Sequence, residues 1–335
     1  MTAQWSEEIL SYKLETIMKS NLSRRRFITG IGASAGAVAA GNMMTAAGEG
    51  SGKAGVPFSY CLNTSTIRGQ NLSLDKEIEI AAGAGYTGIE PWIRKISDYT
   101  GGGGSLRDIR KKLDDSGVTV ESAIDFSRWI VDDDAERKKG FEQVKRAMDL
   151  LAQIGGKRIA APPAGATRQP GLDLMKAAER YRALLELGDE MGVVPQLETW
   201  GSSKNLHRLG QAMFVVIESG HPKACFLPDV YHTYKGGSDF HGYKQLSAHA
   251  VQVLHMNDYP ADPPRETISD RDRVMPGDGI APITQIIRDL IANGSRAVLS
   301  LELFNPNYWK QDPLTVAKIG MAKMKDEVNK ALDVS

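Results

Sequence analysis

The chain has 335 residues and equal numbers of basic and acidic side chains, 41 Lys and Arg against 41 Asp and Glu, so its formal net charge is zero. This balance argues against a nucleic-acid-binding protein, which needs a strongly basic face, and against a polybasic membrane-surface protein. The two cysteines, Cys61 and Cys225, exclude a disulfide scaffold or a cysteine-rich zinc site, and their apolar surroundings predict buried free thiols.

Residues 1–47 have the pattern of an export signal. Paired arginines at Arg24-Arg25 precede a weakly apolar run, rich in Gly and Ala, that extends to about Ala47, and this order resembles a twin-arginine (Tat) signal peptide. The run has too few large apolar residues for a stable membrane span. An amphipathic helix with an incidental arginine cluster is the alternative. We predict cleavage after Ala39 or Ala47 and a periplasmic or other extracytoplasmic location.

The twin-arginine route carries folded proteins, so a metal can be loaded before export. Mn²⁺ binds more weakly than Cu²⁺ or Zn²⁺ at most protein sites, and early loading in the cytoplasm protects it from that competition. The predicted signal therefore hints at a cofactor acquired inside the cell.

Residues 48–335 alternate short apolar runs with longer amphipathic stretches. The apolar runs predict strands at residues 58–63, 87–90, 118–124, 158–161, 193–198, 224–229, 251–255 and 298–302. The stretches with helical spacing predict helices at residues 74–84, 106–116, 135–154, 172–191, 206–219, 243–248, 282–293 and 315–332. Eight such units predict an α/β fold of one domain, the (β/α)8 TIM barrel, because a doubly wound open sheet seldom needs eight regular alternations.

Two other segments are predicted to be loops. The glycine run 101–104 lacks the Lys-Ser/Thr pair of a phosphate-binding loop, and residues 261–274 are rich in proline and charge. The second loop follows the seventh strand, on the side of a barrel where functional loops lie. No dinucleotide fingerprint and no clustered cations for a phosphate group are visible.

A residue able to bind a metal ends each of the last four predicted strands: Glu198, Asp229, His255 and Glu302. The carboxyl ends of barrel strands converge on one rim, so we expect these side chains to meet. Three carboxylates without a cation would repel one another. The oxygen-rich set suits Mn²⁺, Co²⁺ or Mg²⁺ better than a structural zinc ion. For any one residue, a helix cap or a salt-bridge partner is the alternative.

These positions, with the Asp-x-x-His element at 229–232 and the Arg-x-x-Pro-Gly-x-Gly element at 273–279, resemble the sugar phosphate isomerase/epimerase superfamily. These xylose isomerase-like barrels include ketose 3-epimerases and inosose dehydratases, and the resemblance covers essentially all of residues 48–335. It implies one divalent ion, with Mn²⁺ favoured and Co²⁺, Mg²⁺ or Zn²⁺ as alternatives, bound by Glu198, Asp229, His255 and Glu302. It also implies that His232 and Arg273 contact substrate oxygens; an exposed loop cation is the alternative for Arg273.

The sequence departs from this family pattern at two places. A Pro-rich insertion enlarges the spacer between His255 and Arg273, and Lys204 stands where ketose epimerases commonly have an additional glutamate. These departures leave the identity of the substrate open.

Such a site can polarise a carbonyl so that a carboxylate removes the adjacent proton, giving a metal-stabilised enediolate. The resemblance implies that Glu198 and Glu302 are the acid/base pair and that His232 steadies the oxyanion. We therefore predict a metal-dependent isomerase or epimerase acting on a ketose or keto-sugar derivative. A lyase or dehydratase using the same site and a non-catalytic sugar-binding barrel are the alternatives. A zinc nuclease is disfavoured by the zero net charge and the six histidines. The expected partner is a small sugar, and the sequence does not determine whether the protein forms an oligomer.

Aromatic side chains near the strand ends can pack on the apolar faces of a sugar. Trp200, two residues after Glu198, is the best candidate for substrate binding. Others are Trp92, Phe126, Trp129, Tyr231, Phe304, Tyr308 and Trp309, for each of which a place in the rim core is the alternative. Glu90, at the end of the second strand, is expected either to face the pocket or to cap a helix.

Overall fold

The computed structural model describes residues 57–332, so the predicted signal peptide lies outside the described residues. Eight short strands form the centre: β1 (Ser59–Asn63), β2 (Gly88–Glu90), β3 (Thr119–Val120), β4 (Arg158–Ala161), β5 (Val194–Glu198), β6 (Phe226–Leu227), β7 (Val253–Met256) and β8 (Val298–Leu301). Neighbouring strands are parallel, in the orders β3-β2-β1-β8-β7 and β4-β5-β6.

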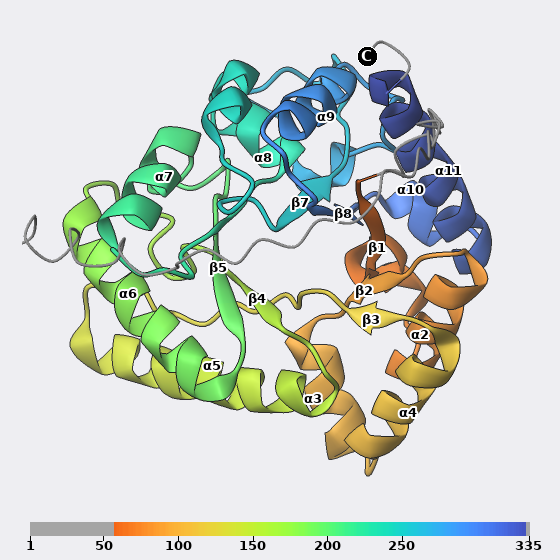
Figure 1. Cartoon of the computed structure of the whole chain (residues 1–335), viewed down its shortest axis with the longest axis horizontal. Coiled ribbons are helices and arrows are strands. Elements are labelled where there is room, and N and C mark those ends of the chain that lie inside the picture. The colour runs from red at the N-terminus through yellow and green to blue at the C-terminus, as the bar shows by residue number, and fades with distance from the viewer. Residues whose placement is uncertain (1–56, 333–335) are drawn as a thin grey trace, which may run out of the picture. The chain divides into compact units, whose positions relative to one another are not determined.

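Hydrogen bonds at both edges join these two groups of strands into a closed barrel. Between β3 and β4, the Ala160 N–H donates to the Ala123 carbonyl at 2.8 Å. Between β6 and β7, the His255 N–H donates to the Pro228 carbonyl at 2.9 Å, and Asp229 pairs with His255 in a parallel bridge. Figure 1 shows the strands at the centre with helices around them. The predicted (β/α)8 TIM barrel is confirmed.

The helices that surround the strands are α2 (Leu74–Gly83), α3 (Ile93–Gly101), α4 (Leu106–Ser116), α5 (Asp134–Gln153), α6 (Leu174–Met191), α7 (Leu209–Glu218), α8 (Val230–Lys235), α9 (Ile283–Ala292), α10 (Pro306–Trp309) and α11 (Pro313–Leu332). Three 3₁₀ helices complete the set: η1 (Thr64–Gln70), η2 (Phe240–Gln245) and η3 (Asp270–Asp272). The structure differs from the sequence prediction in the short elements. Residues 243–248 were predicted as a helix, but the turn is η2, and α3, α8 and α10 were not predicted.

The predicted glycine loop also begins later than expected, because Gly101 is still the last residue of α3. The α3 helix buries only Ile93 and Ile96, which is too short an apolar repeat to stand out in the sequence. Strands β3 and β6 are shorter than predicted, since regular pairing stops where the chain turns into the rim loops.

Two apolar layers hold the barrel together. The larger one lies between the strands and the surrounding helices. A smaller cluster joins side chains from five strands across the barrel interior: Cys61, Ala160, Leu227, Val253 and Val298, with Ile124 beside them. These residues fill the interior as the layered side chains of such barrels do. Cys61 and Cys225 are buried free thiols, as predicted. The polar residues at the carboxyl ends of the strands therefore gather above a closed apolar floor.

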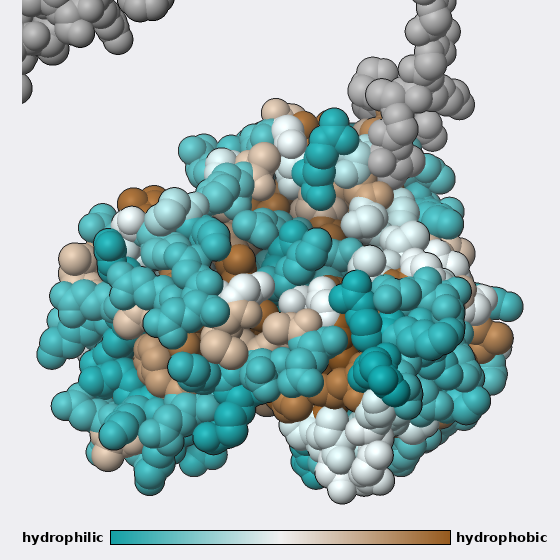
Figure 2. All heavy atoms as spheres, turned by 60° about the horizontal axis from the view of Figure 1, so that its bottom comes forward, coloured by the Kyte–Doolittle hydropathy of each residue, from teal (hydrophilic) through white to brown (hydrophobic). Residues whose placement is uncertain are grey.

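The face shown in Figure 2 is mainly hydrophilic, and hydrophobic residues appear on it chiefly in recesses between polar ones. Among residues 57–332, no helix combines the length and the apolar character that a membrane crossing needs.

Candidate active site

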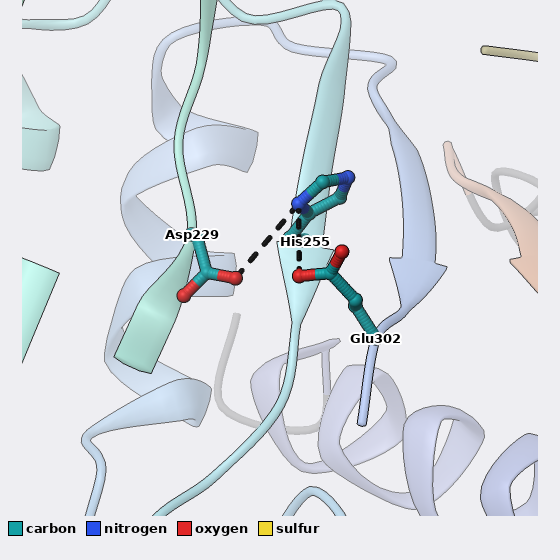
Figure 3. Close-up of side chains that lie close together, drawn as sticks. All are labelled: Asp229, His255 and Glu302. Atoms are coloured by element: carbon teal, nitrogen blue, oxygen red, sulfur yellow. Dashed lines mark ion pairs between the residues drawn. The ribbon is translucent and has the colours of Figure 1, made fainter. Parts of the chain in front are cut away.

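Three of the four predicted ligands meet at the carboxyl ends of neighbouring strands. Asp229 follows β6, His255 lies on β7 and Glu302 follows β8, and one ligand atom of each lies within 4.8 Å of the other two. His255 Nδ1 is 3.3 Å from Glu302 Oε2 and 3.8 Å from Asp229 Oδ2. Figure 3 shows the three side chains pointing toward one another. The expected convergence on the barrel rim is found.

The fourth residue, Glu198 at the end of β5, lies beside this group. Its Oε1 is 3.8 Å from His255 Nδ1. Glu198 and Glu302 line the cavity above, whereas Asp229 and His255 are fully buried beneath it. The rim therefore presents two carboxylates to a ligand and keeps one carboxylate and the imidazole below them.

Glu90, on β2, fixes the orientation of the His255 ring. His255 Nε2 donates to Glu90 Oε2 at 3.1 Å, and Ser300 Oγ and Asn63 Nδ2 donate to the same oxygen at 2.7 and 2.9 Å. With Nε2 turned to Glu90, Nδ1 faces the carboxylates and has no hydrogen-bond partner of its own. Glu90 is not the cap of the next helix, because Trp92 occupies that position. The sequence does carry one signal for a buried role of Glu90: an acidic residue stands inside the apolar run Gly88-Ile89-Glu90-Pro91.

The site carries an excess of buried negative charge. Burial raises the pKa of Glu198 well above its usual value, and the carboxylates of Glu302 and Asp229 raise it further. Burial alone would lower the pKa of His255, but the adjacent Glu302 and Glu90 raise it well above its ordinary value. Without a cation the imidazole therefore takes up a proton that a metal at Nδ1 would displace.

These residues fit a divalent cation. An unpartnered, fully buried His255 Nδ1 faces carboxylate oxygens, and the second ring nitrogen is held by a carboxylate, which is the usual arrangement behind a metal-binding histidine. The donor set of one nitrogen and several oxygens suits Mn²⁺, Co²⁺ or Zn²⁺. The residues that would hold the ion are Glu198, Asp229, His255 and Glu302.

Arg273 is completely buried, so the alternative of an exposed loop cation is wrong. Its Nη1 donates to Asp229 Oδ2 and to Glu302 Oε2, each at 2.9 Å, and its Nη2 donates to Asp270. Burial raises the pKa of Asp229, but the charge of Arg273 outweighs that effect and holds this pKa below its ordinary value. Arg273 thus offsets part of the negative charge of the same oxygens that face His255.

His232, on α8, is the other predicted substrate contact, and it lines the cavity. Burial, assisted by the charge of Arg273, lowers the pKa of His232, so the ring is neutral near pH 7. The Gly201 N–H donates to His232 Nδ1 at 3.2 Å, which assigns the ring proton to Nε2. Nε2 lies 3.1 Å from Arg273 Nη2. Both side chains also line the cavity, where a substrate oxygen can approach them.

The loop that delivers Arg273 is built around the Asp258 carboxylate. Asp258 accepts from the backbone N–H groups of Gly277, Gly279 and Ala281 at 3.0, 3.0 and 2.9 Å. Gly277 has φ of +81°, a left-handed conformation that favours glycine. At Gly279 a Cβ atom would overlap the Tyr259 carbonyl and the Asp258 carboxylate. The Pro-Gly-x-Gly segment is therefore required by close packing at the rim.

A cavity of about 540 Å³ opens above the acidic group, and aromatic rings form much of its wall. Trp200 lines it as predicted, with Trp92, Phe126, Phe304 and Trp309. The rings of Trp92 and Phe126 meet edge to face with centroids 5.1 Å apart. The other candidates belong to the core or support the rim: Trp129 packs on Tyr181, Tyr231 stacks on Arg273, and the Tyr308 hydroxyl accepts from the Met275 N–H. Lys204 does not line this cavity.

Comparison with known proteins agrees with this geometry. Residues 78–327 match the family described as Xylose isomerase-like TIM barrel, and the chain belongs to that family. An inosose isomerase of Bacillus velezensis is 25% identical over 264 residues, 76% of this chain and 91% of that protein. A 3-dehydroshikimate dehydratase of Pseudomonas aeruginosa is 25% identical over 70% of this chain, which spans 37% of that larger protein.

A solved structure shares the fold. The crystal structure of the IOLI protein with a zinc atom has a TM-score of 0.75 and 23% identity, covering 82% of this chain and 99% of that one. The relatives are isomerases, epimerases and dehydratases, and this chain is an enzyme of the same superfamily.

Proposed function

We propose that this protein is a metal-dependent isomerase or epimerase of a ketose or keto-sugar derivative, with Glu198 and Glu302 as its acid/base pair. One observation carries the proposal: these two carboxylates both line the cavity, from strands β5 and β8, while Asp229 and His255 are buried below them. Two carboxylates that face one substrate space from different strands can act on a C–H group from two sides.

Mn²⁺ is our first choice for the ion, with Co²⁺, Mg²⁺ and Zn²⁺ as alternatives. A divalent ion bound in this site supplies polarisation of a substrate carbonyl, which makes the neighbouring C–H group more acidic. The related IOLI structure contains a zinc atom, which supports a divalent metal without choosing between these ions.

The side chains of this protein would then move the proton. One of Glu198 and Glu302 removes it from the carbon beside the carbonyl, leaving an enediolate whose oxygen accepts from His232 Nε2 and Arg273. Return of a proton to the opposite face gives an epimer, and return to the adjacent carbon gives an isomer. Trp200 and the other cavity rings pack on the apolar face of the sugar.

Proton exchange tests this proposal. Purified protein with its metal content measured by elemental analysis is incubated in D₂O with a panel of keto-sugars. Deuterium at the carbon beside the carbonyl of recovered sugar supports the proposal. Glu302→Gln should abolish the exchange, whereas Glu186→Gln, on the exposed face of α6, should leave it unchanged. No exchange with any keto-sugar by metal-loaded protein would contradict it.

A dehydratase is the second candidate. It is favoured by the similarity to 3-dehydroshikimate dehydratase and by Lys204, which replaces a glutamate commonly present in ketose epimerases. The same proton removal followed by loss of a β-hydroxyl would give an unsaturated product. The D₂O experiment separates the two, since a new ultraviolet-absorbing enone indicates elimination. A non-catalytic sugar-binding barrel would bind sugars but would give neither deuterium exchange nor an enone product.

We also propose export by the twin-arginine route, on the sequence of residues 1–47. Replacing both arginines of the pair, Arg24→Lys with Arg25→Lys, should retain the protein in the cytoplasm as an uncleaved precursor. Arg26→Lys, which lies outside the pair, is the matched control and should be exported. Equal export of all three forms, measured by cell fractionation, would exclude this route.

A further inference from the structure

A second positively charged group lies at the mouth of the cavity, apart from Arg273. It consists of Arg68, on η1, and Arg271, on η3, both exposed and both lining the cavity. They come from distant parts of the sequence, so no cluster of cations was visible in the sequence itself. The fold brings them together because η1 follows β1 and η3 belongs to the loop after β7.

Arg68 is held in place by aromatic rings. Its guanidinium carbon lies 4.8, 5.3 and 5.2 Å from the ring centroids of Trp92, Phe304 and Trp309. Trp309 is itself fixed, since its Nε1 donates to the Ser65 carbonyl at 3.0 Å. Ring faces attract the cation but do not accept the in-plane N–H groups in the way an anion does. Arg68 is therefore ordered in advance, with its donors available.

Neither arginine has an acidic partner. Within residues 57–332, no hydrogen bond or ion pair joins the side chain of Arg68 or Arg271 to a carboxylate, although many other arginines of the barrel have one. Burial lowers the pKa of Arg68, the charge of Glu302 in the same cavity raises it, and the nearby charge of Arg271 lowers it. The two guanidinium groups repel each other, and an anion bound between them would offset that repulsion.

The two arginines and the acidic group belong to the same cavity. Phe304 lies between the two levels of the cavity: the guanidinium carbons of Arg68 and Arg273 are 5.3 and 5.0 Å from its centroid. Arg273 in turn contacts Glu302. Arg68, Arg271 and Glu302 all line this one cavity of about 540 Å³, so one substrate can contact Glu302 at one end and Arg68 at the other.

We propose that Arg68 and Arg271 form an anion-binding subsite that receives a carboxylate or phosphate group at the far end of the keto-sugar substrate. The nature of this substrate rests on the proposed function, whereas the anion subsite does not. The substrate class narrows from keto-sugars in general to keto-sugar acids or phosphates.

Binding of inorganic phosphate and of acetate tests the subsite without reference to sugars. Calorimetric titration is run on the wild type, Arg68→Gln, Arg271→Gln and the double variant. Arg296→Gln is the matched control, because Arg296 is exposed and lies two residues before β8, at the opposite end of the barrel. We expect the double variant to lose at least about tenfold in affinity for one of the anions, and the control to lose none. Equal binding by the wild type and the double variant, or no binding by either, overturns the subsite.

A matched set of ketoses identifies the anion. D-fructose, D-fructuronate and D-fructose 6-phosphate share a keto-sugar and differ in the group at the far end. The wild type should bind one anionic member more tightly than D-fructose, and the double variant should bind all three alike. The tighter member shows whether the group is a carboxylate or a phosphate. If D-fructose binds as tightly as both anions, the subsite is refuted while the sugar chemistry stands. If no ketose binds but phosphate binding still depends on Arg68 and Arg271, the subsite stands and the proposed function fails.

Discussion

Glu90 and His255 are joined by a hydrogen bond of 3.1 Å across the barrel, with both side chains fully buried. Their strands, β2 and β7, are not neighbours, since β1 and β8 lie between them. Each intervening strand contributes a donor to the same Glu90 oxygen: Asn63 from β1 and Ser300 from β8. One carboxylate therefore ties four strands together and fixes the ring whose other nitrogen faces Asp229 and Glu302.

Glu90→Gln should weaken metal binding more than it weakens the fold. The substitution keeps the shape of the side chain but removes the negative charge that makes the imidazole a better ligand. Loss of such a partner behind a metal-binding histidine costs about 10- to 100-fold in metal affinity. Calorimetric titration with Mn²⁺ measures the effect, and Glu186→Gln is the surface control. An unchanged affinity for Mn²⁺ would show that the charge of Glu90 does not support metal binding.

Arg273→Gln should make stability depend more strongly on the metal. Arg273 Nη1 contacts one oxygen each of Asp229 and Glu302, so its removal takes away the guanidinium that pairs with both buried carboxylates. Breaking a buried ion pair by removing one partner costs about 3–5 kcal/mol. A divalent ion would offset the same charge, so Mn²⁺ should raise the melting temperature of the variant more than that of the wild type.

Thermal unfolding with and without Mn²⁺ checks this expectation. The control is Arg182→Gln, an exposed arginine paired with Glu186, which should respond to Mn²⁺ as the wild type does. If Mn²⁺ raised the melting temperature of the wild type and of both variants equally, Arg273 and the metal would not act on the same carboxylates.

The sequence was sufficient to predict the barrel and the meeting of Glu198, Asp229, His255 and Glu302, because strand ends in a closed parallel barrel share one rim. It was insufficient for Glu90, since an acid after a strand has the same pattern whether it caps a helix or supports a buried histidine. Arg68 was not predicted, because its position depends on the rings of Trp92, which follows β2, and Trp309, in the segment after β8. Interactions across the barrel have no local pattern in the sequence.

Gly279→Ala should damage the loop that carries Arg273. A methyl group there would overlap the Tyr259 carbonyl and the Asp258 carboxylate, which holds the loop through backbone N–H groups. Overpacking of this kind costs about 1–3 kcal/mol. Urea unfolding measures the loss. Gly101→Ala is the control: a Cβ there meets nothing within 4 Å, and alanine in a helix is favoured over glycine by about 0.5–1 kcal/mol. If Gly279→Ala lost no stability relative to the wild type, the loop would adapt freely to the added methyl group.

Glu77→Gln should stabilise the protein above neutral pH. Glu77, on α2, is buried with Lys95 Nζ at 3.5 Å, and burial raises its pKa to about 7. In the unfolded chain this pKa is about 4.3, so between the two values the folded state holds a proton that the unfolded state releases. The wild type therefore loses stability as pH rises through this range, by up to about 4 kcal/mol for this one group. Glutamine does not titrate, so the advantage of the variant should be larger at about pH 8 than at about pH 5.

Glu79, two residues further along the same helix, provides a control of opposite sign. Hydrogen bonds from Lys112 and Lys76 lower its pKa to about 2, so its stabilising contribution is present above the unfolded pKa and is lost as pH falls toward about 2. Glu79→Gln should therefore reduce stability slightly near neutral pH, and added salt should shrink the difference because the pairs are exposed. Urea unfolding of both variants across this pH range should give differences from the wild type of opposite sign near pH 8. If both variants differed from the wild type in the same direction near pH 8, burial would not govern the titration of Glu77.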